Sequence, residues 1–572
     1  MLGSARVLWT PVALLTRLHR SGLRVADTFA LWQGRFAAPA TGFRQQLEPR
    51  STGQAARGVQ MLAGNYLIDG RPMELGTTPP WDLDAPTLAA DLHGFAWLDD
   101  VAAVDNDASR ATAQDWVFDW IDRYDTGQGP GWRADLTGRR VIRWIHHAIL
   151  ILHRRSPDDS RRYFRSLARQ SRFLSRRWRS VPAGLPRFEA LAGLVYAGLA
   201  LDGLSHLLDP ALRALARECA REIADDGALP ERDPEAMAEV LTLLAWVNLA
   251  VSSTGQPMHN DIINALDRLA PALRAVRMGD GHLARFHGSA GGRPDRIDQA
   301  LSDAMIRTPA NPEGAMGYTR LAAGGTVVVA DTAPLPTAPK SDRAHASSLA
   351  FELSEGRIPI ITNMGAARKF GPEMRQKARQ TASHSTLVVD DVSSARFITD
   401  GIIGATFGQR LGSAPRNVGV SRETTPEGLR ARTWHDGYRK SHGLTHERTL
   451  LLLHTGGKLV GLDRVRCMSA KDKERLSHRM ERSADRTLDL KIYFNAHPDV
   501  DVSIGMRDTV AAFRTITGST WLLRVNDGHL SLADTVYVDE TRLQPRATKQ
   551  VVVSWPINDY DDAVTWTLSR AD

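Results

Sequence analysis

The chain has 572 residues, which is too long for one ordinary hydrophobic core and predicts two large domains. Hydrophobic residues make up 42% and charged residues 24%, a balance typical of a folded soluble protein that excludes a disordered or fibrous chain. Lys and Arg outnumber Asp and Glu by 72 to 65, and this modest excess suits an anionic partner such as an acidic polysaccharide, a nucleic acid or a membrane surface. The two cysteines, Cys219 and Cys467, allow neither a disulfide framework nor a thiolate metal cluster.

The first 60 residues are predicted to form an N-terminal extension that is membrane-proximal or flexible. Arg6 precedes a short apolar run over residues 7–15, which Thr10 and Pro11 interrupt. This pattern fits a weak signal peptide or an amphipathic helix, and the helix is the favoured interpretation. No other apolar stretch approaches the roughly 20 residues that cross a bilayer, so we expect no transmembrane segment.

Residues 61–290 are predicted to be a helical domain. Apolar residues recur there at helical spacing, as in the stripe formed by Trp116, Trp120 and Tyr124. The further helices are expected over residues 141–152, 189–204, 212–223, 236–251 and 262–276, separated by short breaks rich in Gly, Pro or Asp. Short connections favour antiparallel pairs of helices.

The spacing of apolar residues changes between Gly279 and Pro312, where the string GDGHLARFHGSAGGRPDR contains five glycines and has little periodicity. Short β-branched runs follow, and they predict strands over residues 326–329, 349–353, 358–361, 386–389, 449–453 and 551–553. Leu349, Phe351 and Leu353 alternate with small or polar residues, as in a strand buried on one face. Residues 310–572 are therefore predicted to be a β-sandwich or a related stacked-sheet domain.

Three strings in this second half could form one site: AHASSLAFELS, then NMG, then TASHSTLVVD. If they are neighbouring strands, His345, Asn363 and His384 converge, and imidazole nitrogens with an amide oxygen can bind a divalent cation. The alternative is a polar cluster that satisfies loop backbone groups.

Two other clusters attract attention. WHDGY, with Trp434, His435 and Tyr438, could line a sugar-binding groove, although a hairpin turn at Asp436-Gly437 with incidental polar residues is the slightly favoured interpretation. DGHLARFHG offers His282 and His287 in the loop between the halves, where clefts commonly form, but a solvated linker is the simpler interpretation. The sequence has no phosphate loop, dinucleotide fingerprint or nucleophile elbow, so we expect neither nucleotide chemistry nor a nucleic-acid partner.

The strings AHASSLAFELS, NMG and TASHSTLVVDD resemble the C-terminal domain of the heparinase II/III family of polysaccharide lyases. In that family a His-rich segment leads into Ser-Phe-Glu-Leu, then Asp-Pro-Gly, then Ala-His-Asn-Thr, and the order and spacing agree. Similarity extends through LHGFAWLDDVAA, GYTRLAAGGTVVVADTAP and WHDGYRKSHGLTHER, which covers most of the chain from about residue 60. More narrowly, the chain resembles an alphaproteobacterial branch of the family.

The resemblance implies an α+β multidomain fold, an N-terminal incomplete (α/α) toroid followed by a C-terminal antiparallel β-sandwich. It implies β-elimination on a uronic-acid polysaccharide, in which donors neutralise the carboxylate, a base removes the C5 proton and an acid protonates the leaving oxygen. It also points to the cell envelope or periplasm, with the cytoplasm as the alternative because no clear signal peptide is seen.

Carried over residue by residue, the resemblance is incomplete. His345 and His384 match metal-ligand positions, but Asn363 stands where an Asp is usual and removes one negative charge. A divalent metal, zinc or calcium, is thus the one cofactor candidate. Arg343 replaces the first His of the family's catalytic pair and stays protonated, so it cannot be an ordinary base. The family's Asn or His before Glu189-Ala190 and its Tyr after an Asp-Gly pair are both missing.

The remaining candidates fall into two groups. Carboxylate-neutralising and acid-base residues would be Arg187, Glu231, Arg232, His287, Arg343 and Tyr438. Substrate-binding residues would be His282, which is also a candidate base, Arg379, Trp434 and His435.

Three functions compete. The first is a lyase that cleaves an acidic polysaccharide bound between toroid and sandwich, and the retained histidines favour it. The second is a catalytically inactive polysaccharide-binding or envelope-assembly protein, favoured by the missing Tyr and His. A third is a glycoside hydrolase that uses Glu231 with another carboxylate, because helical toroids also host hydrolysis.

Overall fold

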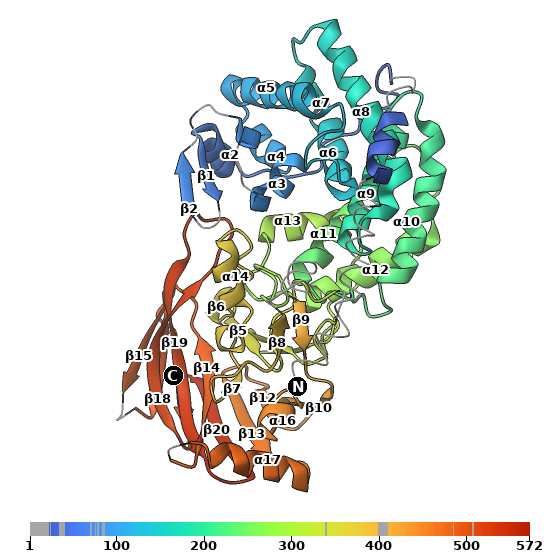
Figure 1. The fold of residues 1–572 in the computed structure, drawn as a ribbon. Helices are drawn as coiled ribbons and strands as arrows, with labels where there is room; N and C mark the ends of the chain where they lie inside the picture. Colours follow the sequence, from blue (N-terminus) through green and yellow to red (C-terminus); the bar gives the residue numbers. More distant parts are fainter. Residues whose placement is uncertain are drawn as a thin grey trace.

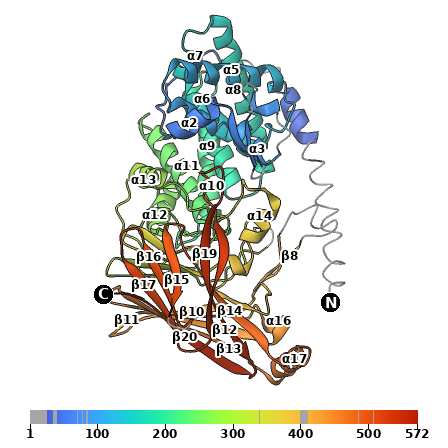
Figure 2. The ribbon, with the colours of Figure 1, turned by 90° about the vertical axis from the view of Figure 1, so that its left-hand side faces the viewer.

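The computed structural model describes residues 22, 25–33, 40–68, 71–74, 76, 79–82, 86–337, 340–398, 410–483, 485–505 and 508–571. The signal peptide or amphipathic helix predicted for residues 7–15 lies outside these residues. The described chain has a helical part and a part built from sheets, which lie one above the other in Figures 1 and 2.

The helical part is an incomplete toroid of paired helices, as the sequence predicted. Within it α6 (Ala134–His146) packs on α9 (Leu185–Ala200), and α9 packs on α10 (Leu208–Glu222) and α11 (Pro234–Ser252). Helix α11 also packs on α12 (Asn260–Ala275) and α13 (Pro294–Asp303). A small hairpin, β1 (Asn65–Ile68) and β2 (Arg71–Glu74), is inserted after the first of these helices. The helices are α2 (Ala55–Leu62), α3 (Pro86–His93), α4 (Trp97–Ala102), α5 (Asp107–Tyr124), α6 (Ala134–His146), α7 (Ala148–Leu152), α8 (Pro157–Arg177), α9 (Leu185–Ala200), α10 (Leu208–Glu222), α11 (Pro234–Ser252), α12 (Asn260–Ala275) and α13 (Pro294–Asp303).

The second part is a sandwich of antiparallel sheets, which confirms the predicted fold. An eight-stranded sheet has the order β10 (Val418–Thr424), β11 (Gly428–His435), β12 (Thr445–Leu453), β13 (Lys458–Arg466), β20 (Asp561–Arg570), β17 (Thr520–Val525), β16 (Val510–Thr515), β15 (Val500–Gly505). Two four-stranded sheets have the orders β18 (His529–Tyr537), β19 (Arg546–Ile557), β14 (Leu488–Asn495), β7 (Leu387–Val389), and β3 (Tyr318–Ala323), β4 (Thr326–Asp331), β5 (Phe351–Glu355), β6 (Ile358–Ile361).

Smaller elements complete this part: a hairpin of β8 (Arg396–Ile398) and β9 (Arg410–Ser413), and the helices α14 (Gly371–Ala378), α16 (Arg439–His442) and α17 (Ala470–Met480). Facing aromatic side chains from different sheets fill the core. The ring of Trp566 lies 5.7 Å from that of Phe351 and 5.0 Å from that of Phe494. Contact between sheets through such rings is the packing expected of a sandwich.

Two details differ from the sequence predictions. The helix expected over 141–152 is interrupted at His147, whose backbone leaves the helical conformation (φ −99°, ψ 20°). Strand β5 is buried on both faces rather than one. Its Glu352 is only 2% exposed, because the backbone N–H groups of Asn363 (2.7 Å) and Arg285 (3.1 Å) donate to its carboxylate.

Residues 40–54, which we call the N-terminal strap, lie against the helical part. The N–H of Arg44 donates to the carbonyl of Ala200 (2.8 Å), and the hydroxyl of Ser51 donates to Asp99 (2.6 Å). Farther along, the N–H of Gln54 donates to Asp100 (2.7 Å). This stretch of the predicted N-terminal extension is therefore held in place by hydrogen bonds at both ends.

Capping residues fix where the helices nearest the sheets begin. Asp233 accepts hydrogen bonds from the N–H groups of Glu235 (3.0 Å) and Ala236 (3.2 Å), and Pro234 opens α11. Within the described residues, α11 is also the one helix long and apolar enough to cross a membrane, but 67% of its apolar stretch is buried inside the protein. Its composition is that of a core helix.

Candidate functional site

A groove of about 460 Å³ runs along the seam between the two parts, and we call it the seam groove. On the helical side its walls come from α2, β1, α3, α4, α6, α9, α11 and the start of α13 with the residues before it. On the other side they come from Arg343, the residues before α14 and the β18–β19 connection, residues 539–543. The volume lies within the roughly 300–1,000 Å³ typical of ligand sites. A groove is thus present between the two parts, where the sequence predicts that a substrate would bind.

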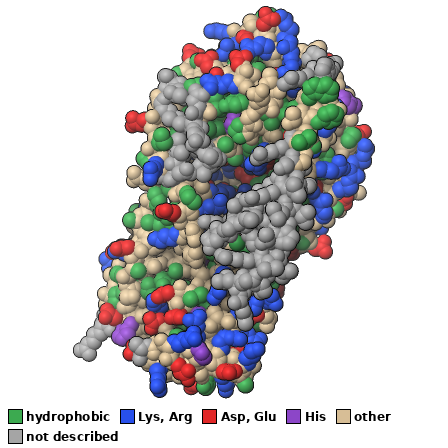
Figure 3. All heavy atoms as spheres, viewed as in Figure 1, with side chains coloured by type: hydrophobic (Ala, Val, Ile, Leu, Met, Phe, Trp, Pro, Cys, Tyr) green, Lys and Arg blue, Asp and Glu red, His purple; other side chains and the backbone are tan. Residues whose placement is uncertain are grey.

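Charged side chains dominate the seam groove. Figure 3 shows Lys and Arg side chains at mid-height of the molecule, where the two parts meet. Nine cationic residues face seven anionic ones, which leaves a modest positive excess. The cationic residues are Arg57, Arg139, Arg143, Arg293, Arg296, Arg343, Arg368, Lys369 and Arg542, and the anionic residues are Asp91, Asp100, Glu189, Glu235, Glu239, Asp539 and Glu540.

Arg368 ties the two walls of the groove together. Its guanidinium contacts Glu235 on α11 (3.0 Å) and Glu540 in the β18–β19 connection (3.1 Å). Burial alone would raise the pKa of Glu540, but attraction to Arg368 outweighs it and lowers that pKa. The contact therefore depends on an ionised Glu540 and links sheet to helix across the groove.

Glu189 is a buried carboxylate in the wall of the groove. It lies on α9, is 5% exposed, and accepts a hydrogen bond from Nε of Arg139 (2.6 Å) through Oε1. Its Oε2 has no hydrogen-bond partner among the described residues. Burial raises the pKa of Glu189 to about 7, and attraction to Arg139 offsets only part of that effect. Near neutral pH this group can accept or donate a proton.

Tyr66 on β1 is the tyrosine of the groove. Its side chain is 6% exposed, and its hydroxyl has no hydrogen-bond partner in the described part of the chain. Burial raises the pKa of that hydroxyl above its usual value, so Tyr66 can donate a proton far more readily than it can act as an anion. Among the described residues that line the groove there is no histidine.

Arg343 is the one sequence-predicted site residue that lines the seam groove. Its side chain is 35% exposed, and Nη1 lies 3.3 Å from Oδ2 of Asp233. Asp233 itself is fully buried, and burial raises its pKa to about 6 although Arg343 opposes the change. Arg343 presents a positive charge to the groove from the sheet side, where the resemblance would place a histidine.

The predicted metal cluster lies behind Arg343 in the interior. Nδ1 of His345 is 3.0 Å from Nε2 of His384, and His384 donates through Nδ1 to the carbonyl of Gln380 (2.8 Å). Oδ1 of Asn363 accepts from the backbone N–H of Ser385 (3.2 Å). Burial lowers the pKa of both imidazoles, so both rings are neutral.

These residues fit a divalent metal poorly. The two imidazoles are hydrogen-bonded to each other and the amide oxygen is occupied by a backbone group. Nowhere in the described chain do three His, Cys, Asp or Glu side chains gather in a way that could hold a metal ion. The cluster has the contacts of the polar alternative, in which side chains satisfy one another and loop backbone groups; zinc or calcium binding there stays an untested prediction from the sequence.

His287 and Arg232 lie in the same buried layer and do not line the groove. His287 is fully buried, with Nε2 3.1 Å from Asp331, and its Nδ1 accepts from the N–H of His345 (3.2 Å). Arg232 pairs with the same carboxylate and donates to the carbonyls of Met316, Gly317, Ala333 and Pro334. Both side chains hold the connection between the two parts together.

The other candidates from the helical half are engaged outside the groove. Arg187 pairs with Glu218 (3.4 Å), and Glu231 pairs with Lys340 (2.6 Å). His282 is held by Asp280 (2.9 Å) in a partly exposed turn. None of these three lines the seam groove.

The WHDGY cluster ends β11 and forms a turn, and its His435 and Tyr438 side chains face the interior. Tyr438 is fully buried and donates to the carbonyl of Leu387 (2.8 Å). His435 is fully buried and contacts His446 (3.2 Å). Trp434 on β11 lies opposite Gly419 on β10. Arg379 is 1% exposed and donates to the carbonyl of Ala344 (2.8 Å). The structure therefore places all four away from the groove.

Most residues of the groove were missed by sequence reasoning. Arg139 and Arg143 are four residues apart on α6, and Arg293 and Arg296 are three residues apart at the start of α13. Such spacing places the two cations of each pair on one face of a helix, and this was the sequence signal that could have indicated the groove. Trp246 lies in an apolar run of α11 and could not be told from a core residue.

An incomplete helical toroid joined to an antiparallel sandwich is the fold that this chain shares with solved heparinase structures. Two solved structures share it at low sequence identity. Heparinase III matches with a TM-score of 0.70 and 11% identity, covering 95% of this chain and 88% of that chain. Heparan sulfate lyase HepC from Pedobacter heparinus matches with a TM-score of 0.55 and 14% identity, covering 96% and 88%.

Sequence comparison agrees with the fold. Residues 305–567 match the family description "Heparinase II/III-like, C-terminal". FtsZ-localized protein C of Caulobacter vibrioides (strain NA1000 / CB15N) is 30% identical over 526 residues, which span 90% of this chain and 88% of that protein. The chain belongs to the heparinase II/III-like family.

Proposed function

We propose that this protein is a non-catalytic member of its family that binds an acidic polysaccharide in the seam groove and serves envelope assembly. The observation that carries the proposal is the composition of the groove. Cationic side chains are present on both walls, whereas the described lining holds no imidazole, and Arg343 stands where the family resemblance places a histidine. Arginine recognises carboxylate and sulfate groups but stays protonated, so this composition supports binding more than proton abstraction.

The relationship to FtsZ-localized protein C supports an assembly role. That name associates the relative with FtsZ, and the match extends over both the helical part and the sheets. We propose that the present chain also localises with FtsZ. A fluorescent fusion should colocalise with labelled FtsZ, and a uniform distribution would contradict this part of the proposal.

β-Elimination is the second candidate function, and the pair Tyr66 and Glu189 favours it. Both line the seam groove, and each has a polar atom with no hydrogen-bond partner among the described residues. In this alternative Arg343 or Arg368 would neutralise the uronate carboxylate, Glu189 would take the C5 proton, and Tyr66 would protonate the leaving oxygen. The raised pKa of Glu189 makes it a base that works near neutral pH.

One assay separates the two functions. The purified chain is incubated with polygalacturonate, alginate, hyaluronan and heparan sulfate, while ultraviolet absorbance follows conjugated, unsaturated uronate and calorimetry follows binding. We expect binding of at least one polymer without growth of the absorbance band. Growth of the band that is lost in Glu189→Gln would favour the lyase, and absence of binding to every polymer would contradict the proposal.

Two variants connect binding to the groove. Arg343→Ala and Lys369→Ala remove cations from its sheet-side wall, and each should weaken binding about fivefold, which corresponds to about 1 kcal/mol. Arg524→Ala is the matched control, because Arg524 is exposed on β17 and lies outside the groove. Equal losses in all three variants would indicate nonspecific attraction.

A further inference from the structure

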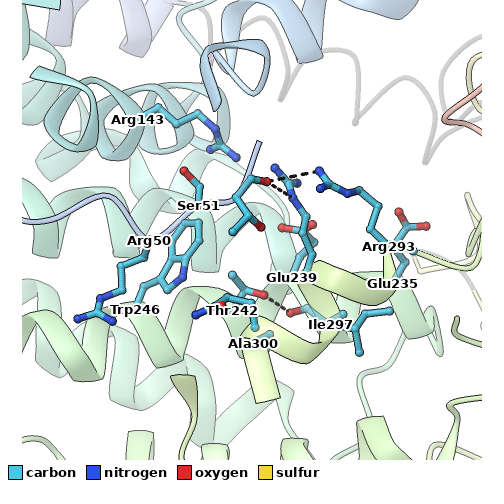
Figure 4. A pocket seen from close by; sticks show the side chains of 15 residues that line it. Arg50, Ser51, Arg143, Glu235, Glu239, Thr242, Trp246, Arg293, Ile297 and Ala300 are labelled. Carbon is cyan, nitrogen blue, oxygen red and sulfur yellow. Dashed lines mark hydrogen bonds between the residues drawn. The ribbon is translucent and has the colours of Figure 1, made fainter. Parts of the chain in front are cut away.

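A smaller pocket adjoins the seam groove beneath the N-terminal strap (Figure 4). It encloses about 80 Å³, against about 460 Å³ for the groove, and Arg143, Glu239 and Trp246 line both. Arg50 and Thr242 line the small pocket alone. The pocket is therefore a side chamber of the groove with walls of its own.

The strap is a fixed wall of this pocket. The carbonyl of Thr52 accepts hydrogen bonds from Nη1 of Arg293 (3.4 Å) and Nε of Arg296 (3.3 Å), two of the contacts drawn in Figure 4. The next residue, Gly53, packs so closely that a Cβ there would lie 1.8 Å from the carbonyl oxygen of Asp99. With Ser51 also bound to Asp99, the strap closes the pocket on one side and has little room to move.

The side chains around the pocket suit a sugar acid. Trp246 offers an aromatic wall, against which the apolar face of a pyranose ring can pack. Glu239 is attracted to the charge of Arg296 but makes no hydrogen bond or close ion pair among the described residues, so its carboxylate oxygens can accept sugar hydroxyls. Arg50 is 37% exposed, and its ion-pair partner Asp303 is 3.9 Å away, beyond hydrogen-bond length. Its guanidinium can therefore receive a carboxylate.

The size of the pocket fits one sugar unit. At about 10–15 Å³ for each water position, about 80 Å³ corresponds to between five and eight waters. One pyranose ring with its substituents displaces about that many, whereas the groove has room for several units.

We infer that the pocket is an end subsite, which takes the terminal uronic-acid unit of a bound chain while the strap prevents the chain from continuing. The inference rests on the proposed binding of an acidic polysaccharide. It adds that the protein recognises chain ends rather than internal stretches.

The test uses size-defined oligosaccharides of two to eight units from whichever polymer of the panel binds most tightly. Calorimetry on the full chain compares the wild type with Arg50→Gln and Thr242→Phe, which alter the small pocket alone. Thr254→Phe is the matched control, because Thr254 has the same type of side-chain bond to a preceding carbonyl, just after α11, and lies outside both cavities. Oligosaccharides with a carboxyl-reduced terminal unit probe the role of Arg50.

We expect the affinity per chain to become constant once the oligosaccharide fills the groove, and both pocket variants to lose tenfold or more. The carboxyl-reduced ligand should bind the wild type and Arg50→Gln equally. An affinity that keeps rising in proportion to chain length, with Thr242→Phe equal to Thr254→Phe, would overturn the end subsite and leave the proposed function standing. If Thr242→Phe does not fold, the affinity of Arg50→Gln alone tests the end subsite. If none of the oligosaccharides binds the wild type, both the end subsite and the proposed function are overturned.

Discussion

Replacing Glu189 by Gln tests the buried carboxylate of the seam groove through the pH dependence of stability. Burial raises the pKa of Glu189 to about 7 from an ordinary value of 4.5. Between these pH values the folded protein holds a proton that the unfolded chain releases, so this group makes the protein less stable as pH rises. A pKa difference of about 2.5, at about 1.4 kcal/mol for each pKa unit, lowers the free energy of unfolding by about 3 kcal/mol by pH 8.

The assay is urea unfolding of the wild type and Glu189→Gln at pH 4.5, 6 and 8. The free energy of unfolding of the variant, relative to the wild type, should increase by about 3 kcal/mol from the lowest to the highest pH. Glu474→Gln, an exposed glutamate on α17, is the control and should follow the wild type. Parallel curves for Glu189→Gln and the wild type would refute this reasoning, because they would mean that the pKa of Glu189 is the same in the folded and the unfolded protein.

Three further predictions concern other charged groups. Arg368→Ala should lower the free energy of unfolding by about 1–3 kcal/mol, measured as a lower thermal midpoint, because Glu540 is left without its partner across the groove. An unchanged midpoint would show that the ion pair between Arg368 and Glu540 does not stabilise the protein. Burial lowers the pKa of His446 despite its contact with Asp463 (2.6 Å), so the protein should become less stable as the pH drops below about 6.5. In acid titrations followed by circular dichroism, His446→Gln should lose stability less steeply than the wild type. An equally steep loss would contradict His446 as the cause. A chelator should leave the thermal midpoint unchanged, because the His345 cluster is already satisfied by protein groups; a drop restored by zinc would show a metal site.

The fold could be predicted from the sequence because its signals are local. The helical spacing of apolar residues up to about residue 276 and the short β-branched runs beyond residue 326 each follow from the periodicity of one element. The prediction failed where tertiary contacts decide. Glu352 has the alternation of a solvent-facing strand residue, but backbone N–H groups from two loops bury its carboxylate.

Only the location of the candidate site could be predicted. A groove at the seam was expected, yet Arg343 is the single predicted residue that lines it. His435, Tyr438 and Arg379 have the chemistry of site residues, but all three are buried and hydrogen-bonded to other protein groups. Polar residues that stabilise a buried layer and those that face a ligand look alike in one sequence, because burial is set by distant strands.

The most direct test of the central claim is a titration of the purified chain with an acidic polysaccharide, with heat of binding and ultraviolet absorbance recorded on the same sample. The account predicts saturable binding that weakens in Arg343→Ala, and a flat absorbance trace. Steady growth of the unsaturated-uronate band, or no heat of binding with any polymer of the panel, would contradict it.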